Sequence, residues 1–133
     1  MIFKGEGEFL EINVSGRLYP NENWLGAEIR IDVPGFTAQY GTCLRSDDLQ
    51  WFYEAIVQLK NNVSTRAEFT TMEGGLYLNC ELQRTGRVDC TGKADNNTGN
   101  VLEFYMSLEN QAICNLLLQL ERLLKDYPVM GHP

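Results

Sequence analysis

Short stretches in which apolar and polar residues alternate run through most of this sequence. From Leu25 to Val33 every second residue is apolar, and the same spacing returns from Leu76 to Leu82. Successive side chains of a β-strand point to opposite faces, so this spacing is typical of strands with one buried and one exposed face. The buried faces require a cover, which helices of the same chain can provide.

Turn residues separate the alternating stretches. Pro34-Gly35, Gly74-Gly75 and Thr85-Gly86 are each followed by a new stretch, as expected for hairpins of neighbouring antiparallel strands. The sequence therefore predicts strands over residues 8–15, 24–33, 36–44, 66–72, 76–83, 87–94 and 101–108.

Two other segments have apolar residues at helical spacing. The first begins at Ser46, a good N-cap residue, and closes at Asn61-Asn62. The second begins at Asn110 and ends before Pro128, because proline cannot continue a helix. We expect the tail from Val129 to Pro133 to be loose.

The predicted order is βββα followed by ββββα, which indicates the α+β class. We expect about seven antiparallel strands in one curved or barrel-like sheet, packed with two helices in a single domain over residues 1–133. Residues 38–59 and 102–123 share one pattern of apolar positions, and each pattern reads as a strand followed by a helix.

Charge limits the classes of partner. Eighteen acidic residues against 11 basic ones give a net charge of −7, which disfavours nucleic acid and attracts basic proteins, although simple solubility is an alternative explanation. No run of 18 apolar residues and no signal peptide is found, so we expect a cytoplasmic protein that does not engage a membrane. Four cysteines without paired spacing read as free thiols: Cys43, Cys80, Cys90 and Cys114.

The residues of an ordinary active site are not found in this sequence. The one histidine, His132, lies next to the C-terminus, and no zinc, calcium or phosphate-binding motif occurs. Glu28 and Asp32 share a strand face, but Arg30 between them suggests a solvated charge ladder. We therefore expect no enzyme, no catalytic residue, no cofactor and no bound metal.

One tryptophan is the best candidate for a binding residue. On a helical wheel Trp51 falls opposite the apolar face of its helix, among acidic residues. A tryptophan surrounded by carboxylates resembles an interface hot spot for a basic partner, unless a loop covers it. The predicted partner-binding residues are Asp47, Asp48, Trp51 and Glu54.

A family resemblance rests on features spread along nearly the whole chain. They are the early strand Leu10–Val14, Asn23-Trp24-Leu25, Pro34-Gly35-Phe36, Asp48-Leu49 before Phe52-Tyr53 and Leu59, Leu102-Glu103-Phe104, Asn110-Gln111, and Tyr127-Pro128-Val129. In these features the chain resembles the WapI-family immunity proteins, small bacterial proteins that neutralise polymorphic, contact-dependent toxins.

The resemblance implies a non-catalytic α+β domain that binds the toxic domain of a cognate toxin, which is basic if the acidic charge is complementary. It transfers no binding residue, because such residues vary with the toxin. Two alternatives remain open: a curved sheet or barrel that binds a small ligand without catalysis, and a structural subunit that dimerises through the broad leucine face of the second helix, from which Leu118 lies apart. If the chain is an immunity protein, we expect it to be a monomer or a weak dimer.

Overall fold

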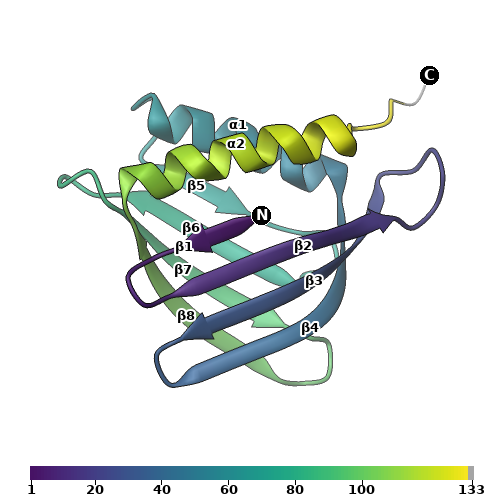
Figure 1. Cartoon of the computed structure of the whole chain (residues 1–133), viewed down its shortest axis with the longest axis horizontal. Helices are drawn as coiled ribbons and strands as arrows, with labels where there is room; N and C mark the ends of the chain where they lie inside the picture. Colours follow the sequence, from purple (N-terminus) through teal and green to yellow (C-terminus); the bar gives the residue numbers. More distant parts are fainter. Residues whose placement is uncertain (132–133) are drawn as a thin grey trace.

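The computed structural model describes residues 1–131 and has four strands before each of its two helices (Figure 1). The elements are β1 Ile2–Lys4, β2 Phe9–Arg17, β3 Trp24–Val33, β4 Phe36–Arg45, α1 Ser46–Lys60, β5 Arg66–Phe69, β6 Leu76–Leu82, β7 Val88–Asp95, β8 Val101–Leu108 and α2 Asn110–Asp126.

The strands form two antiparallel sheets of four, in the orders β1-β2-β3-β4 and β5-β6-β7-β8. The α+β class, the antiparallel pairing and the two helices are confirmed, and every predicted strand is present. Two details differ from the prediction: β1 is an additional strand, and the sheets are separate instead of forming one curved sheet. β1 is too short for alternation to reveal it, and α1 lies between β4 and β5, so no hairpin joins the sheets.

The apolar faces of both sheets meet in one core. Ile29 and Ile31 of β3 and Leu78 of β6 are fully buried there. Phe52 of α1 lies between the sheets: its ring centre is 6.0 Å from that of Phe3 in β1 and 5.2 Å, edge-on, from that of Phe69 in β5. One helical side chain therefore packs against both sheets.

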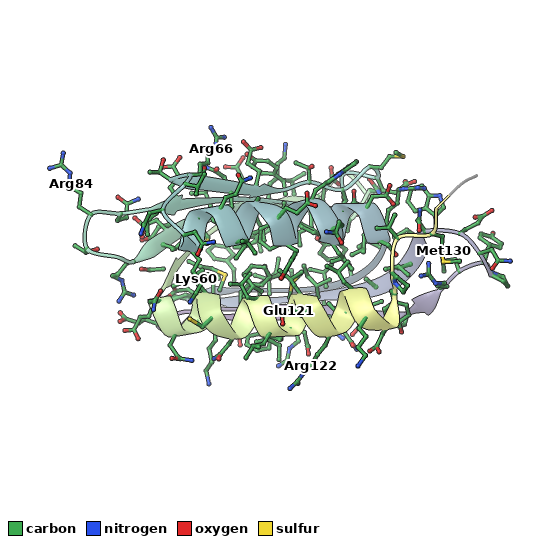
Figure 2. All side chains as sticks on the ribbon, turned by 90° about the horizontal axis from the view of Figure 1, so that it is seen from above. Lys60, Arg66, Arg84, Glu121, Arg122 and Met130 are labelled. Carbon is green, nitrogen blue, oxygen red and sulfur yellow. The ribbon has the colours of Figure 1, made fainter. Side chains whose placement is uncertain are left out.

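The two helices lie next to each other on the same side of the sheets (Figures 1 and 2). Tyr53 of α1 donates a hydrogen bond from its hydroxyl to Glu121 of α2 at 3.2 Å. Lys60 Nζ of α1 lies 2.7 Å from Cys114 Sγ of α2. These contacts fix the helices relative to each other along their exposed seam.

The sequence repeat corresponds to a structural repeat. Residues 38–59 cover most of β4 and α1, and residues 102–123 cover most of β8 and α2, as the repeated strand-to-helix pattern predicted. The structure extends this unit to four strands and a helix, which occurs twice.

The C-terminal segment is held against the first sheet, so the expectation of a loose tail from Val129 was wrong for its first residues. The buried Asn23 side chain accepts the Met130 N–H at 2.7 Å and donates to the Met130 carbonyl at 3.3 Å. Arg17 donates to the carbonyl of Pro128 at 2.6 Å. The sequence around Asn23 contains no pattern that predicts these hydrogen bonds, because the partner residue Met130 lies more than a hundred positions away.

Candidate partner-binding surface

Trp51 lies on the outer face of α1 and points away from the core. Its side chain is 62% exposed, whereas the next residue, Phe52, is fully buried. Among residues 1–131, therefore, no loop covers Trp51. A large, exposed and rigid aromatic ring on a helix is a common anchor of protein interfaces.

A second large apolar side chain lies close to Trp51. Met72, in the connection between β5 and β6, is 72% exposed. Trp51 and Met72 border a shallow depression of about 260 Å³, whose other walls are Arg45, Asp47, Asp48, Thr70 and Thr71. The hydroxyl of Thr71 is buried there without a hydrogen-bond partner among the described residues. The depression thus offers the apolar contact area of Trp51 and Met72 to an incoming side chain.

Asp47 lies in the wall of this depression, as predicted for a binding residue. Its Oδ1 is 3.4 Å from Nη2 of Arg45, an ion pair without a hydrogen bond. The guanidinium of Arg45 lies over the ring of Trp24, 5.1 Å from the ring centre, and this contact holds it in place. Asp47 therefore carries a partly neutralised charge at the edge of the depression.

Asp48 is placed differently from its neighbours. Its side chain is only 4% exposed, and Oδ2 accepts the backbone N–H of Arg45 at 2.8 Å. Burial raises the pKa of the Asp48 carboxyl above its ordinary value, although the hydrogen bond from Arg45 opposes this shift. Asp48 therefore stabilises the start of α1 and is not an exposed part of the surface.

The helix caps differ from the sequence expectation by one residue. Arg45 and Glu109, not Ser46 and Asn110, are the N-cap residues. Ser46 is fully buried and its hydroxyl has no partner among residues 1–131. The Asp48 carboxylate accepts the N–H of the N-cap residue Arg45. The sequence pattern did not predict this contact, because it indicated Ser46 as the N-cap.

Glu54 is exposed one turn after Trp51 and accepts a hydrogen bond from Gln50 at 3.2 Å. It shares the outer face of α1 but does not line the depression. The structure therefore brings Asp47, Asp48 and Trp51 together and places Glu54 beside them. We call Asp47, Trp51, Glu54 and Met72 the Trp51 surface.

A second, larger hollow lies between α2 and the first strand. This α2–β1 groove has a volume of about 680 Å³, and Leu118, 55% exposed, lies in its wall. Charged residues of both signs line it: Lys4, Glu6, Glu109 and Arg122. Sequence reasoning missed the groove because it missed β1.

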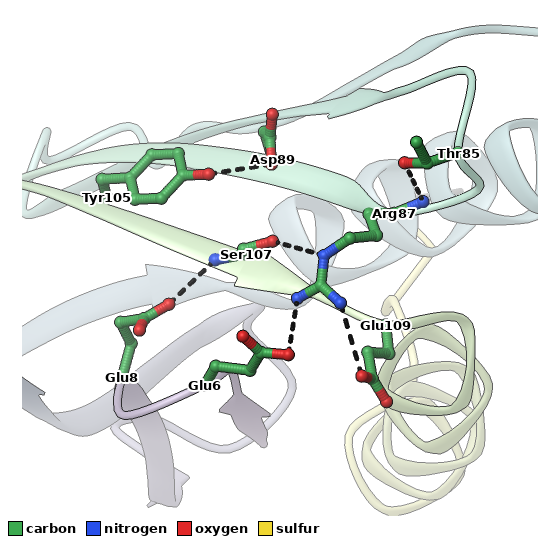
Figure 3. Close-up of polar contacts among 8 residues, drawn as sticks. All are labelled: Glu6, Glu8, Thr85, Arg87, Asp89, Tyr105, Ser107 and Glu109. Carbon is green, nitrogen blue, oxygen red and sulfur yellow. Dashed lines mark hydrogen bonds and ion pairs between the residues drawn. The ribbon is translucent and has the colours of Figure 1, made fainter.

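A polar network ties one end of the groove to the second sheet (Figure 3). Arg87 donates to Ser107 Oγ at 2.9 Å and forms ion pairs with Glu6 at 3.4 Å and Glu109 at 3.3 Å. Glu8 accepts the backbone N–H of Ser107 at 2.9 Å. Arg87 and these carboxylates contact one another and the main chain, so a structural role explains why they cluster here.

No candidate metal site is found in the described part of the chain. Residues 1–131 contain no group of three or more histidine, cysteine or acidic side chains arranged to hold a metal ion. His132 lies outside the described residues. Within the same range, no helix is long and apolar enough to cross a membrane.

The comparisons with known proteins agree with the sequence resemblance. The WapI-like immunity protein family matches residues 1–128, so this chain belongs to the WapI-like family of immunity proteins. No curated protein matches the sequence.

Among solved structures, the crystal structures of Trypanosoma brucei MRP1/MRP2 contain a chain with a similar fold. The TM-score is 0.54 with 7% sequence identity, and the match covers 93% of this chain and 81% of that one. At this identity the likeness concerns the fold alone.

Proposed function

We propose that this chain is an immunity protein that binds and neutralises a cognate polymorphic toxin domain, without catalysis, in the cytoplasm of the bacterium that makes the toxin. Membership of the WapI-like immunity family over residues 1–128 is the observation that carries this proposal. The toxin belongs to a contact-dependent system and its toxic domain is basic.

We further propose that the toxin contacts the surface around Trp51, with Asp47 and Glu54 as its acidic component; Asp48, the third predicted acidic residue, is buried and supports this surface through its hydrogen bond at the start of α1. The 62% exposure of Trp51 and the neighbouring exposed Met72 support this choice, because exposed aromatic and methionine side chains are enriched at interfaces. The net charge of −7 supports a basic partner, since complementary charge speeds encounter.

Calorimetric titration with the toxic domain encoded beside this gene tests the proposal. We expect nanomolar affinity that weakens as salt is raised, because screening shortens the reach of the acidic surface. Trp51→Ala should weaken binding by roughly 30-fold or more, the loss typical of a hot-spot residue. Leu118→Ala, which removes an apolar side chain of similar exposure from α2 (55% against 62%), is the matched control and should bind like the wild type.

Two outcomes would contradict the proposal at different levels. A folded, active toxin domain that does not bind contradicts the immunity function, and the α2–β1 groove would then become the first place to look for a ligand. Normal binding of the Trp51→Ala variant contradicts the choice of surface only. Ultracentrifugation should find the free protein to be a monomer or a weak dimer.

A further inference from the structure

The two sheets of this protein have four edges, formed by β1, β4, β5 and β8. A strand at the edge of a sheet presents main-chain N–H and C=O groups without partners, and any other extended chain can pair with them. Natural sheets protect such edges with charges, short strands or covering side chains. The four edges here are protected to very different degrees.

Side chains cap the edges of β1 and β8. Gln119 of α2 accepts the Ile2 N–H at 2.7 Å and donates to the Ile2 carbonyl at 3.1 Å, so its amide takes the place of a neighbouring strand. Glu8 accepts the N–H of Ser107 in β8, a strand that also carries the exposed Glu103. β5 is only four residues long and carries Arg66 and Glu68.

The edge of β4 has none of these protections. This strand is ten residues long, and from Phe36 to Leu44 it contains neither a charged residue nor a proline. Val33 and Phe36 are partners across a two-residue turn, so they form the first hydrogen-bonded pair of the β3–β4 ladder. In an antiparallel ladder hydrogen-bonded and non-hydrogen-bonded pairs alternate. Every second residue of β4 therefore points its main-chain N–H and C=O away from β3. These residues are Thr37, Gln39, Gly41 and Cys43, and within residues 1–131 no hydrogen bond reaches their main-chain groups.

The side chains along this edge favour a basic strand. Glu28 and Asp32 of β3 are exposed and lie directly opposite Gly41 and Thr37 in the sheet, with the exposed Arg30 between them opposite Gln39. The Arg30 guanidinium lies over the Phe9 ring, 5.5 Å from its centre and on the side away from β4, so two carboxylates face one guanidinium on this surface. Gly41 leaves open space on this face, since an added Cβ would meet only the carbonyl oxygen of Ala27 at 3.9 Å. A lysine or arginine opposite Gly41 on an incoming strand can therefore extend over Gly41 to the Glu28 carboxylate, whose Oε1 also accepts a hydrogen bond from Gln39 Nε2 at 2.8 Å.

We propose that the β4 edge, from Thr37 to Cys43, pairs with an extended strand of the toxin domain and so adds a fifth strand to the first sheet. The pairing gives main-chain hydrogen bonds, and Glu28 and Asp32 select a basic strand. A second copy of this chain fits less well, since it brings the same carboxylates and the same net charge of −7 to the edge. This inference rests on the proposed toxin-binding function; β4 leads directly into α1, which carries Trp51.

Hydrogen exchange on the full chain with the toxic domain encoded beside its gene tests the pairing directly. In the free protein the amides of Thr37, Gln39, Gly41 and Cys43 should exchange rapidly, and in the complex they should become protected. The amides of Ala38, Tyr40 and Thr42, which face β3, should be protected in both states and serve as internal controls.

A matched pair of variants isolates the main-chain contact. Gly41→Pro removes the N–H that points away from β3 and puts a ring carbon in its place, while the hydrogen bonds of the neighbouring residues to β3 remain. Gly41→Ala also adds a side chain but keeps this N–H. We expect the proline variant to bind roughly tenfold or more weakly than the alanine variant. Should Gly41→Pro fail to fold, Gln39→Lys and Gln39→Glu replace it, and the lysine variant should bind a basic strand more weakly than the glutamate variant.

Each result decides a separate question. Binding of the toxin with unchanged exchange at the outward amides and equal affinity of the two Gly41 variants overturns the pairing and leaves the immunity function intact. Protection of the same amides in the free protein, together with a dimer in ultracentrifugation, overturns it in favour of a second copy. A toxin domain that does not bind the wild type at all refutes the proposed function, and the pairing with it.

Discussion

Trp51 and Phe52 are neighbours on α1, yet the structure assigns them opposite roles, and alanine substitutions should separate those roles. Phe52 is fully buried between the rings of Phe3 and Phe69, so Phe52→Ala should lower the free energy of unfolding by about 3–5 kcal/mol. Trp51 is 62% exposed. The buried remainder, somewhat more than a third of a tryptophan surface of roughly 250 Å², is worth about 25 cal/mol per Å². This sets an upper limit of about 2.4 kcal/mol on the stability lost in Trp51→Ala.

Urea denaturation followed by circular dichroism measures both values. The two variants should show similar m-values, so that differences in midpoint report stability. In toxin binding the order should reverse, with Trp51→Ala the more damaging of the two at temperatures where both variants are folded. A loss of stability for Trp51→Ala equal to that of Phe52→Ala would refute the assignment of Trp51 as a free surface residue.

Three further predictions concern the fold. Burial raises the pKa of the Asp48 carboxyl above its ordinary value of 3.8, so the native state binds the proton on this carboxyl more tightly than the unfolded chain does. The free energy of unfolding should therefore fall as pH rises from 3.8 through the folded pKa. Urea denaturation at a series of pH values should show a smaller fall in the Asp48→Asn variant, which has no carboxyl to titrate there. Gly92→Ala should cost about 1–3 kcal/mol in the same assay, because its methyl group would collide with the Phe104 ring, whereas Gly41→Ala should cost less. In timed alkylation read by mass spectrometry, the partly exposed Cys43 and Cys114 should react before the buried Cys80 and Cys90; equal rates would contradict the packing between β6 and β7.

The local parts of this fold were predictable because their signals are local. Alternation from Leu25 to Val33 depends on neighbouring residues alone, and so does the helical spacing that turns Phe52 inward and Trp51 outward. β1 was missed because three residues carry too little of the pattern, and it forms only through pairing with β2 and contact with Gln119.

The surface itself was predictable only in part. Asp48 was expected beside Trp51 on the outside, but it turns inward because the N–H of Arg45 needs an acceptor. Met72 comes to the same depression as Trp51 only when β5 and β6 pair, so no sequence pattern around Met72 indicates that the two residues are neighbours there. A helical wheel places side chains around one axis, and it contains no information about the segment that packs beside that axis.

The most direct test of the central claim is survival of bacteria that produce the toxic domain encoded beside this gene. Cells that also produce this chain should grow normally, while cells with the Trp51→Ala variant at equal abundance should lose most of that protection, and the Leu118→Ala variant should protect fully. Growth arrest in cells that contain abundant, folded wild-type protein would contradict the claim that this chain is the immunity protein of that toxin.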